Sequence, residues 1–125
     1  MRLLLDTQIV YWFFFEEQNV PNAAWEVLNR YDEVYVSAAS IWEIAIKVRL
    51  GKMKADPHKV AATLTDAGFI ELPVYARHTV LVANMPLHHG DPFDRLLIAQ
   101  AMEEPMRFLT TDSQLKQYSE LVIEV

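Results

Sequence analysis

The sequence predicts an α/β fold, a single domain of residues 1–125 built on a parallel sheet with helices on both faces. Short apolar or β-branched runs alternate along the chain with segments of helical periodicity, which is typical of a parallel sheet whose crossovers are helices. The 125 residues contain no repeat, linker or low-complexity tract, and they suffice to bury a hydrophobic core.

Five segments are expected to form strands. Arg2–Leu5 is a compact apolar run that ends at Asp6, which suits a strand covered on both faces. The other runs combine apolar, β-branched and aromatic residues between turn signals. They are residues 34–36, Phe69–Leu72, Arg107–Thr110 and 121–125.

Helices are expected between the strands, because apolar residues recur there at helical spacing. Proline after Asp56 and after Asp91 fits a first helical turn, and Gly51 and Gly68 are typical helix stops. The expected helices are residues 8–15, a segment opened by Pro21-Asn22, residues 37 to about 50, 57 to about 67, 74–84, 92 to about 104 and a short one through Tyr118. The helix after Asp91 is apolar on nearly all sides, so we expect burial on more than one face.

An aromatic run at residues 11–15 covers more than a full helical turn. One core face cannot hide all five rings. The helix is therefore either enclosed within the domain or exposes some of its rings to a partner, and the sequence leaves both alternatives open.

Composition narrows the functional classes. The absence of cysteine excludes disulfides, a thiolate nucleophile and a zinc–cysteine site. The N-terminal leucines run into Asp6, and no apolar run approaches the length of a membrane span, so we expect a cytoplasmic protein without membrane contact. The net charge of −6 argues only weakly against nucleic-acid binding, because basic patches or bound cations reverse the local field.

Four acidic residues fall where strands end or helices begin. Asp6 follows the first strand and Asp112 the fourth, while Glu43 and Asp94 lie in first helical turns at the same edge. In parallel sheets the ligand site lies beyond the carboxyl ends of the strands. Each acid also has a structural alternative. Asp6 and Asp112 alternatively cap the helices that follow them. Glu43 alternatively completes a capping box with Ser40 or pairs with Lys47. Asp94 alternatively complements the dipole of a helix that Asp91 caps.

Together, four carboxylates at one edge would repel one another and be driven toward protonation unless a cation is bound. Oxygen ligands without cysteine or paired helical histidines favour Mg²⁺ or Mn²⁺ over Zn²⁺. One or two such ions would activate a water and stabilise the charge that develops on a phosphodiester. His88 and His89 adjoin this site and either meet phosphate or, as is more common on a polar loop, are simply solvated.

Four segments in order carry a resemblance to a known family. They are Leu4-Leu5-Asp6-Thr7, residues 37–47 (SAASIWEIAIK), Leu87-His88-His89 with residues 91–101 (DPFDRLLIAQA), and Leu109-Thr110-Thr111-Asp112. Over essentially its whole length the chain resembles the PIN domain family, and closely the VapC-type ribonuclease toxins of type II toxin–antitoxin systems. The resemblance implies a metal-dependent endoribonuclease, usually a homodimer held inactive by a cognate antitoxin. Gln8 departs from it, because similar members usually carry histidine there.

The resemblance also implies roles for particular residues. Asp6, Glu43, Asp94 and Asp112 would form the acidic quartet, with most of the metal binding by the three aspartates. Glu43 would complete the ligand set through water or orient the nucleophile. Apart from the resemblance, the residues themselves offer Arg95, Thr7, Thr110 and Lys47 as candidate RNA contacts. Arg95 is otherwise a surface helix residue, and the two hydroxyls otherwise bind metal-bound water or make ordinary turn and cap hydrogen bonds. Lys47 and the basic residues after it either follow an RNA backbone or complement a helix dipole.

Two other functional classes remain as alternatives. A receiver-like magnesium-binding signalling domain has similar size and sheet class, but it requires an acidic pair after the first strand and a lysine after the last. Here Asp6 stands alone, and the last strand ends at Val125. A non-catalytic α/β regulatory or interaction module would show no RNA cleavage, or cleavage that EDTA leaves unchanged.

Overall fold

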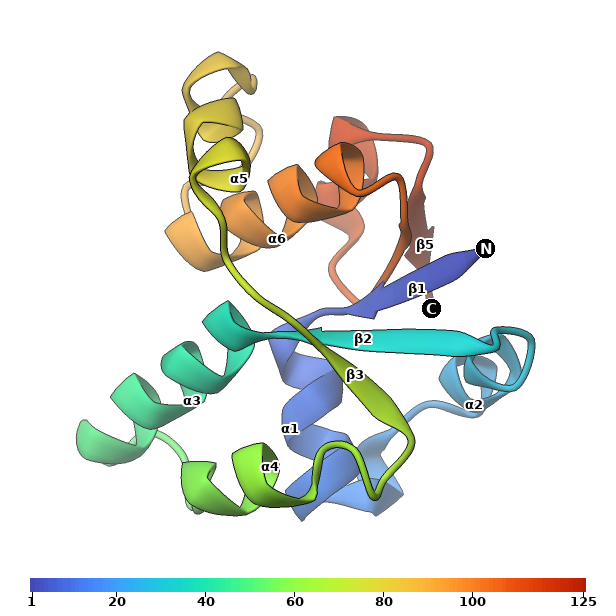
Figure 1. The fold of residues 1–125 in the computed structure, drawn as a ribbon, viewed down its shortest axis with the longest axis vertical. Helices are drawn as coiled ribbons and strands as arrows, with labels where there is room; N and C mark the ends of the chain where they lie inside the picture. Colours follow the sequence, from blue (N-terminus) through green and yellow to red (C-terminus); the bar gives the residue numbers. More distant parts are fainter.

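A computed structural model of residues 1–125 confirms the predicted fold class (Figure 1). Five parallel strands form one sheet in the order β3-β2-β1-β4-β5. They are β1 (Arg2–Leu5), β2 (Glu33–Ser37), β3 (Phe69–Leu72), β4 (Arg107–Thr110) and β5 (Val122–Glu124). The strand order reverses between β1 and β4. This is the switch point at which sheets of this class bind their ligands.

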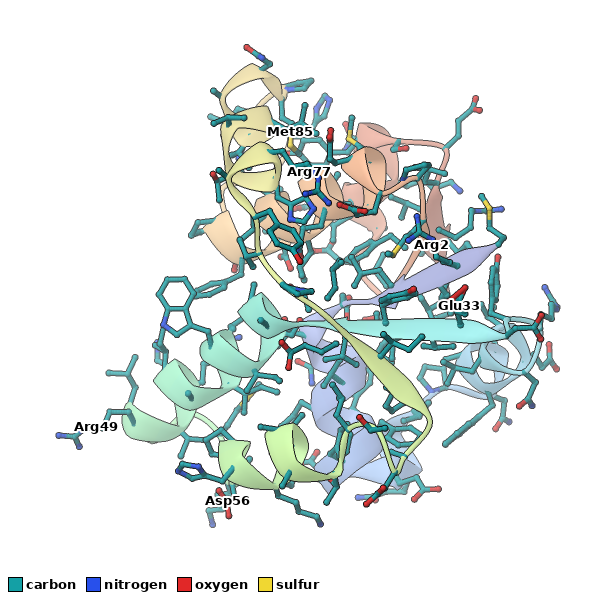
Figure 2. All side chains as sticks on the ribbon, viewed as in Figure 1. Arg2, Glu33, Arg49, Asp56, Arg77 and Met85 are labelled. Carbon is teal, nitrogen blue, oxygen red and sulfur yellow. The ribbon has the colours of Figure 1, made fainter.

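Helices cover both faces of the sheet, as the alternating strand side chains require. Leu3 and Leu5 of β1 belong to one core, shared with α1 to α4, whereas Leu4 belongs to the other, shared with α6. Figure 2 shows side chains filling both layers while Arg49 and Asp56 point outward. No helix has the length and apolar character of a membrane span. The helices are α1 (Thr7–Phe15), α2 (Asn22–Leu28), α3 (Ala38–Arg49), α4 (Pro57–Thr63), α5 (Ala76–Leu81) and α6 (Pro92–Glu103), with 3₁₀ turns at η1 (Glu17–Asn19), η2 (Val82–Asn84) and η3 (Ser113–Tyr118).

The five predicted strands are confirmed to within one residue at each end, and larger differences occur at a few helix ends. Helix α4 stops at Thr63 and not near residue 67, because the chain turns back there: Phe69 N donates to Leu64 O at 3.1 Å, and Gly68 takes a φ of +92°. The segment predicted as a helix over 74–84 begins at Ala76 and tightens into η2 at its end. The segment through Tyr118 is also 3₁₀.

Helix α3 begins earlier than the predicted capping box implies. Its N-cap is Ser37, whose hydroxyl accepts from Ala39 N at 3.0 Å. Ser40 lies within the helix and accepts from the hydroxyl of Thr7, so the capping box from Ser40 to Glu43 was a wrong prediction. Glu43 is thereby free of capping, and it lies in the second turn of α3 and not in the first turn as predicted.

Helix α6 is buried on more than one face, as predicted, because five consecutive residues, 97–101, are all buried. One face packs on the sheet, and the other meets α5 (Figure 1). His78 of α5 is fully buried there, with its Nε2 atom 2.6 Å from Glu104 Oε2. Its Nδ1 atom accepts from Tyr75 N at 3.0 Å. This contact fixes the far end of α6 and leaves its N-terminus at the sheet edge.

The aromatic run at residues 11–15 packs largely within the chain. Tyr11 is buried, and the other four rings are half-buried against the core shared by α1 to α4. Phe13 contacts Trp25 of α2 and Phe69 of β3, with ring centroids 5.6 and 4.8 Å apart. Of the two alternatives, the structure favours the enclosed helix.

Replacing the buried cap residue Ser37 with alanine tests the start of α3. Ser37→Ala removes the acceptor for Ala39 N, so we expect the free energy of unfolding to fall by about 1 kcal/mol. Urea unfolding measures this, with the exposed Ser113→Ala as the matched control, for which we expect a change within about 0.5 kcal/mol. Equal stability of both variants would contradict the cap assignment.

Candidate active site

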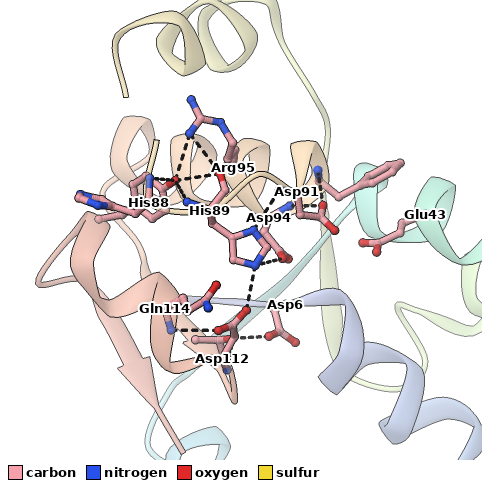
Figure 3. Close-up of polar contacts among 12 residues, drawn as sticks. Asp6, Glu43, His88, His89, Asp91, Asp94, Arg95, Asp112 and Gln114 are labelled. Atoms are coloured by element: carbon pink, nitrogen blue, oxygen red, sulfur yellow. Dashed lines mark hydrogen bonds and ion pairs between the residues drawn. The ribbon is translucent and has the colours of Figure 1, made fainter. Parts of the chain in front are cut away.

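A polar pocket of about 230 Å³ opens at the carboxyl ends of β1 and β4 (Figure 3). Asp6 follows β1, Asp112 follows β4, and Glu43 and Asp94 come from α3 and α6. Nine residues line the pocket: Thr7, Gln8, Glu43, Lys47, Met53, Asp91, Asp94, Thr111 and Asp112. The structure therefore brings the four predicted acids to one place, with three in the wall and Asp6 buried next to them.

Asp6 is 5% exposed and uses both of its carboxylate oxygens. Oδ1 accepts from Ile9 N at 3.0 Å, which caps α1, and Oδ2 accepts from the hydroxyl of Thr110. Burial raises the pKa of Asp6 to about 6, against the opposing effect of these hydrogen bonds, and the charge of Glu43 raises it further. The ionised form of Asp6 is thus costly without a nearby cation.

Asp91 and Asp94 divide two tasks at the start of α6. Asp91 Oδ1 accepts from Phe93 N at 2.8 Å and from Asp94 N at 3.2 Å, so Asp91 is the helix cap. The carboxylate of Asp94 is left to face the other acids. Burial raises the pKa of Asp94 to about 7, and the charges of Asp91, Asp6 and Glu43 add to the rise.

Glu43 contributes the one buried carboxylate oxygen of the site that has no partner. Its Oε2 atom lies 2.8 Å from Lys47 Nζ, which confirms the predicted pairing one turn along the helix. Its Oε1 atom is buried without any hydrogen bond. A buried unpaired carboxylate oxygen is expensive unless a ligand satisfies it.

Of the two histidines predicted to adjoin the site, His89 joins the acidic cluster. Its Nε2 atom lies 3.2 Å from Asp112 Oδ2 and 3.7 Å from Asp94 Oδ2 (Figure 3). Asp112 uses its other oxygen to cap η3, accepting from Gln114 N at 2.9 Å. The preceding residue, His88, takes no part in the cluster, and its ring instead packs on Tyr118.

Two of the four candidate RNA contacts do not lie at the pocket. Thr110 is fully buried, donating to Asp6 and accepting from Asp112 N at 3.0 Å, so it connects two acids and does not face solvent. The guanidinium of Arg95 is turned away from the acids. Its acceptors are the carbonyl oxygens of Val82, Met85, Pro86 and His89 and the hydroxyl of Tyr118. Thr7 and Lys47 do line the pocket.

The donor set fits a hard divalent cation. The acidic groups offer oxygen ligands, one buried oxygen is unpaired, and two carboxyl groups have raised pKa values that a positive charge would lower. Asp6, Asp94, Asp112 and Glu43 are the residues able to hold it. Lys47 is the only cationic side chain among the lining residues.

Comparisons with known proteins identify relatives. The profile of the PIN domain family matches residues 3–121. Ribonuclease VapC22 from Mycobacterium tuberculosis (strain ATCC 25618 / H37Rv) is 31% identical over 122 residues, which cover 93% of this chain and 91% of the relative.

Solved structures share the fold. VapBC2 from Rickettsia felis, bound to a DNA fragment from the promoter, aligns with a TM-score of 0.69 at 15% identity over 100% of this chain and 98% of the other. A toxin–antitoxin complex from Klebsiella pneumoniae gives 0.67 at 12% identity over 98% and 99%. FitAcB from Neisseria gonorrhoeae gives 0.67 at 17% identity over 98% and 96%.

Asp94→Asn tests whether charge repulsion at Asp94 destabilises the folded protein. The measurement is made in EDTA, so that no cation relieves the repulsion. A carboxyl group with a raised pKa in the folded state contributes less stability as the pH rises from about 4 to about 7, because the unfolded chain ionises it freely whereas the folded state must either bind a proton or bury the charge. We therefore expect Asp94→Asn to raise the free energy of unfolding at pH 8 by about 1–2 kcal/mol, since partial exposure screens part of the effect.

Near pH 4 we expect no difference, because the wild-type carboxyl group is then protonated. Urea unfolding at both pH values provides the measurement. Asp66→Asn, at an exposed position outside the pocket, is the control and should change stability at neither pH. A gain for Asp94→Asn that is independent of pH would exclude charge repulsion as its cause.

Proposed function

The chain belongs to the PIN domain family, and from this membership we propose that it is a VapC-type endoribonuclease toxin. Its substrate would be RNA, its cofactor Mg²⁺ or Mn²⁺, and its regulator a cognate antitoxin. The observation that carries the proposal is the convergence of Asp6, Glu43, Asp94 and Asp112 at one sheet edge, with a buried oxygen of Glu43 left unpaired. The relationship to ribonuclease VapC22 supports the choice of RNA.

The aspartates would hold the cation, and Glu43 would act on the nucleophile. Asp94 and Asp112 present oxygens to the pocket, and Asp6 lies next to them. When bound, a divalent cation supplies the positive charge that activates a water and neutralises the phosphodiester. Glu43 Oε1 is free to accept a hydrogen bond from the attacking water and so orient it. Lys47, held by Glu43, and Thr7 are the remaining candidate RNA contacts at the pocket.

The proposal includes protein partners. The structures that share the fold include VapBC2 and a toxin–antitoxin complex, which supports an antitoxin partner for this chain. Large apolar side chains are exposed on the surface: Trp42 at 60%, Val80 at 65% and Leu87 at 81%. Apolar side chains at this exposure suit burial against an antitoxin or a second copy in a homodimer.

Asp94→Asn also tests the activity. Asparagine removes the charge without changing the size of the side chain, so we expect the variant to fold and to lose cleavage of bulk RNA by at least about 100-fold in Mg²⁺ or Mn²⁺. The purified chain without antitoxin is assayed by gel electrophoresis of the RNA. EDTA should abolish wild-type cleavage, and Asp66→Asn should cleave normally. Full activity of Asp94→Asn, or activity that survives EDTA, would reject the proposal.

The pH dependence of cation binding provides a further prediction. Protons and cation compete for Asp6 and Asp94, whose pKa values are about 6 and about 7, so affinity should rise as the pH increases from about 5.5 to about 8. Titration calorimetry with Mn²⁺ measures this, and proton release on binding should accompany it below pH 7. An affinity that does not change over this range would show that neither group is a ligand.

A further inference from the structure

The ring of His89 is held in one tautomer by the backbone. Its Nδ1 atom accepts the N–H of Asp91 at 2.9 Å. A ring nitrogen that accepts a hydrogen bond carries no proton, so in a histidine of this environment the proton lies on Nε2. The Nε2–H group is the one that lies between Asp94 and Asp112, at 3.7 and 3.2 Å from their Oδ2 atoms.

This tautomer indicates whether the Nε2 atom of His89 acts as a hydrogen-bond donor or as a metal ligand. His89, Asp94 and Asp112 each offer an atom within 4.8 Å of the others, as three ligands of one ion would. A histidine ligand, however, needs a free lone pair on the coordinating nitrogen and usually donates its other N–H to an acceptor. Here the other nitrogen faces the N–H of Asp91, a donor, which opposes coordination through Nε2.

The loop that carries His89 is anchored independently of the acids. The hydroxyl of Tyr118 accepts from His88 N at 3.0 Å and from His89 N at 2.8 Å. Arg95 donates to this hydroxyl at 3.0 Å and reaches His89 O at 3.4 Å. The side chain of His89 is 20% exposed. The N–H donor is therefore fixed in place at the acidic cluster before any ligand binds, as preorganised catalytic donors are.

We propose that His89 is a further catalytic residue, whose Nε2–H donates to a phosphate oxygen of the RNA and does not coordinate the cation. The inference rests on the proposed function. A phosphate oxygen is an anionic acceptor like the carboxylate oxygens beside Nε2, and it needs donors in a pocket lined by four acids and one lysine. Lys47 is already paired with Glu43, and the other donor side chains of the wall are the neutral Thr7, Gln8 and Thr111. His89 lies beside this wall and adds a donor whose ring is fixed by the backbone.

Binding of Mn²⁺ to His89→Ala tests the metal half of the proposal without any cleavage. We expect the affinity measured by calorimetry to equal that of the wild type within about threefold, or to be tighter, because no ligand is lost. Asp94→Asn is the positive control and should weaken binding. A loss as large as that in Asp94→Asn would identify His89 as a ligand and overturn the proposal. Failure of the wild type to bind Mn²⁺ would instead reject the proposed function.

Nitrogen-15 NMR of the histidine side chains provides a direct readout of the tautomer. We expect His89 to carry its proton on Nε2 in the free protein and to keep it there in saturating Mg²⁺. A change to the Nδ1–H form when Mg²⁺ is added would show coordination through Nε2 and overturn the proposal.

The substrate half is tested by matched variants in the RNA cleavage assay. His89→Ala should lower kcat/KM by about 10–100-fold, the effect of losing one donor to a charged group. The amide of His89→Gln places an N–H near the Nε2 position and should recover part of the activity, whereas His89→Asn, whose amide reaches only the Nδ1 position, should not. Wild-type kcat/KM in His89→Ala, or equal activities of the Gln and Asn variants, would overturn the proposal.

Discussion

Repulsion among carboxylates at one edge of the sheet is the constraint on which the site depends. The acids that line the pocket beside a single lysine are Glu43, Asp91, Asp94 and Asp112, and Asp6 is buried next to them. Burial removes the water that would otherwise stabilise these charges, and the raised pKa values of Asp6 and Asp94 reflect that cost. The fold must therefore hold the groups together with contacts that do not depend on a cation.

Backbone amides at helix starts supply those contacts. Asp6 and Asp112 each use Oδ1 as the N-cap of the following helical segment, so Oδ2 remains for other contacts. At α6 the two tasks fall on different residues, since Asp91 caps and Asp94 faces the pocket. Capping and site formation are thus not alternatives here. The parallel sheet brings strand ends and helix starts to one edge, and one carboxylate can serve both.

Much of this arrangement could be predicted from local sequence. Acids directly after apolar runs locate the edge of a parallel sheet, and Asp-Pro marks the start of α6. The sequence places His88 and His89 next to the site but does not distinguish them, because the position of His89 depends on Tyr118, which lies 29 residues away, and on Arg95. Arg95 itself looked like a phosphate contact beside Asp94. Only the three-dimensional course of the 82–89 segment reveals the carbonyl groups that surround its guanidinium.

Under the proposed function, the charges of the pocket wall also determine the order in which the cation and the RNA would bind. A polyanion approaching a wall of four acids is repelled, and the one lysine of that wall is already paired with Glu43. RNA would therefore dock productively only after a cation had reversed the local field. The carboxylates of Asp94 and Asp112 would then be occupied by the cation, and the Nε2–H of His89, which lies beside them, would be available to a phosphate oxygen. Under the proposed function, cation binding would thus precede RNA binding because of the charges in the pocket wall itself.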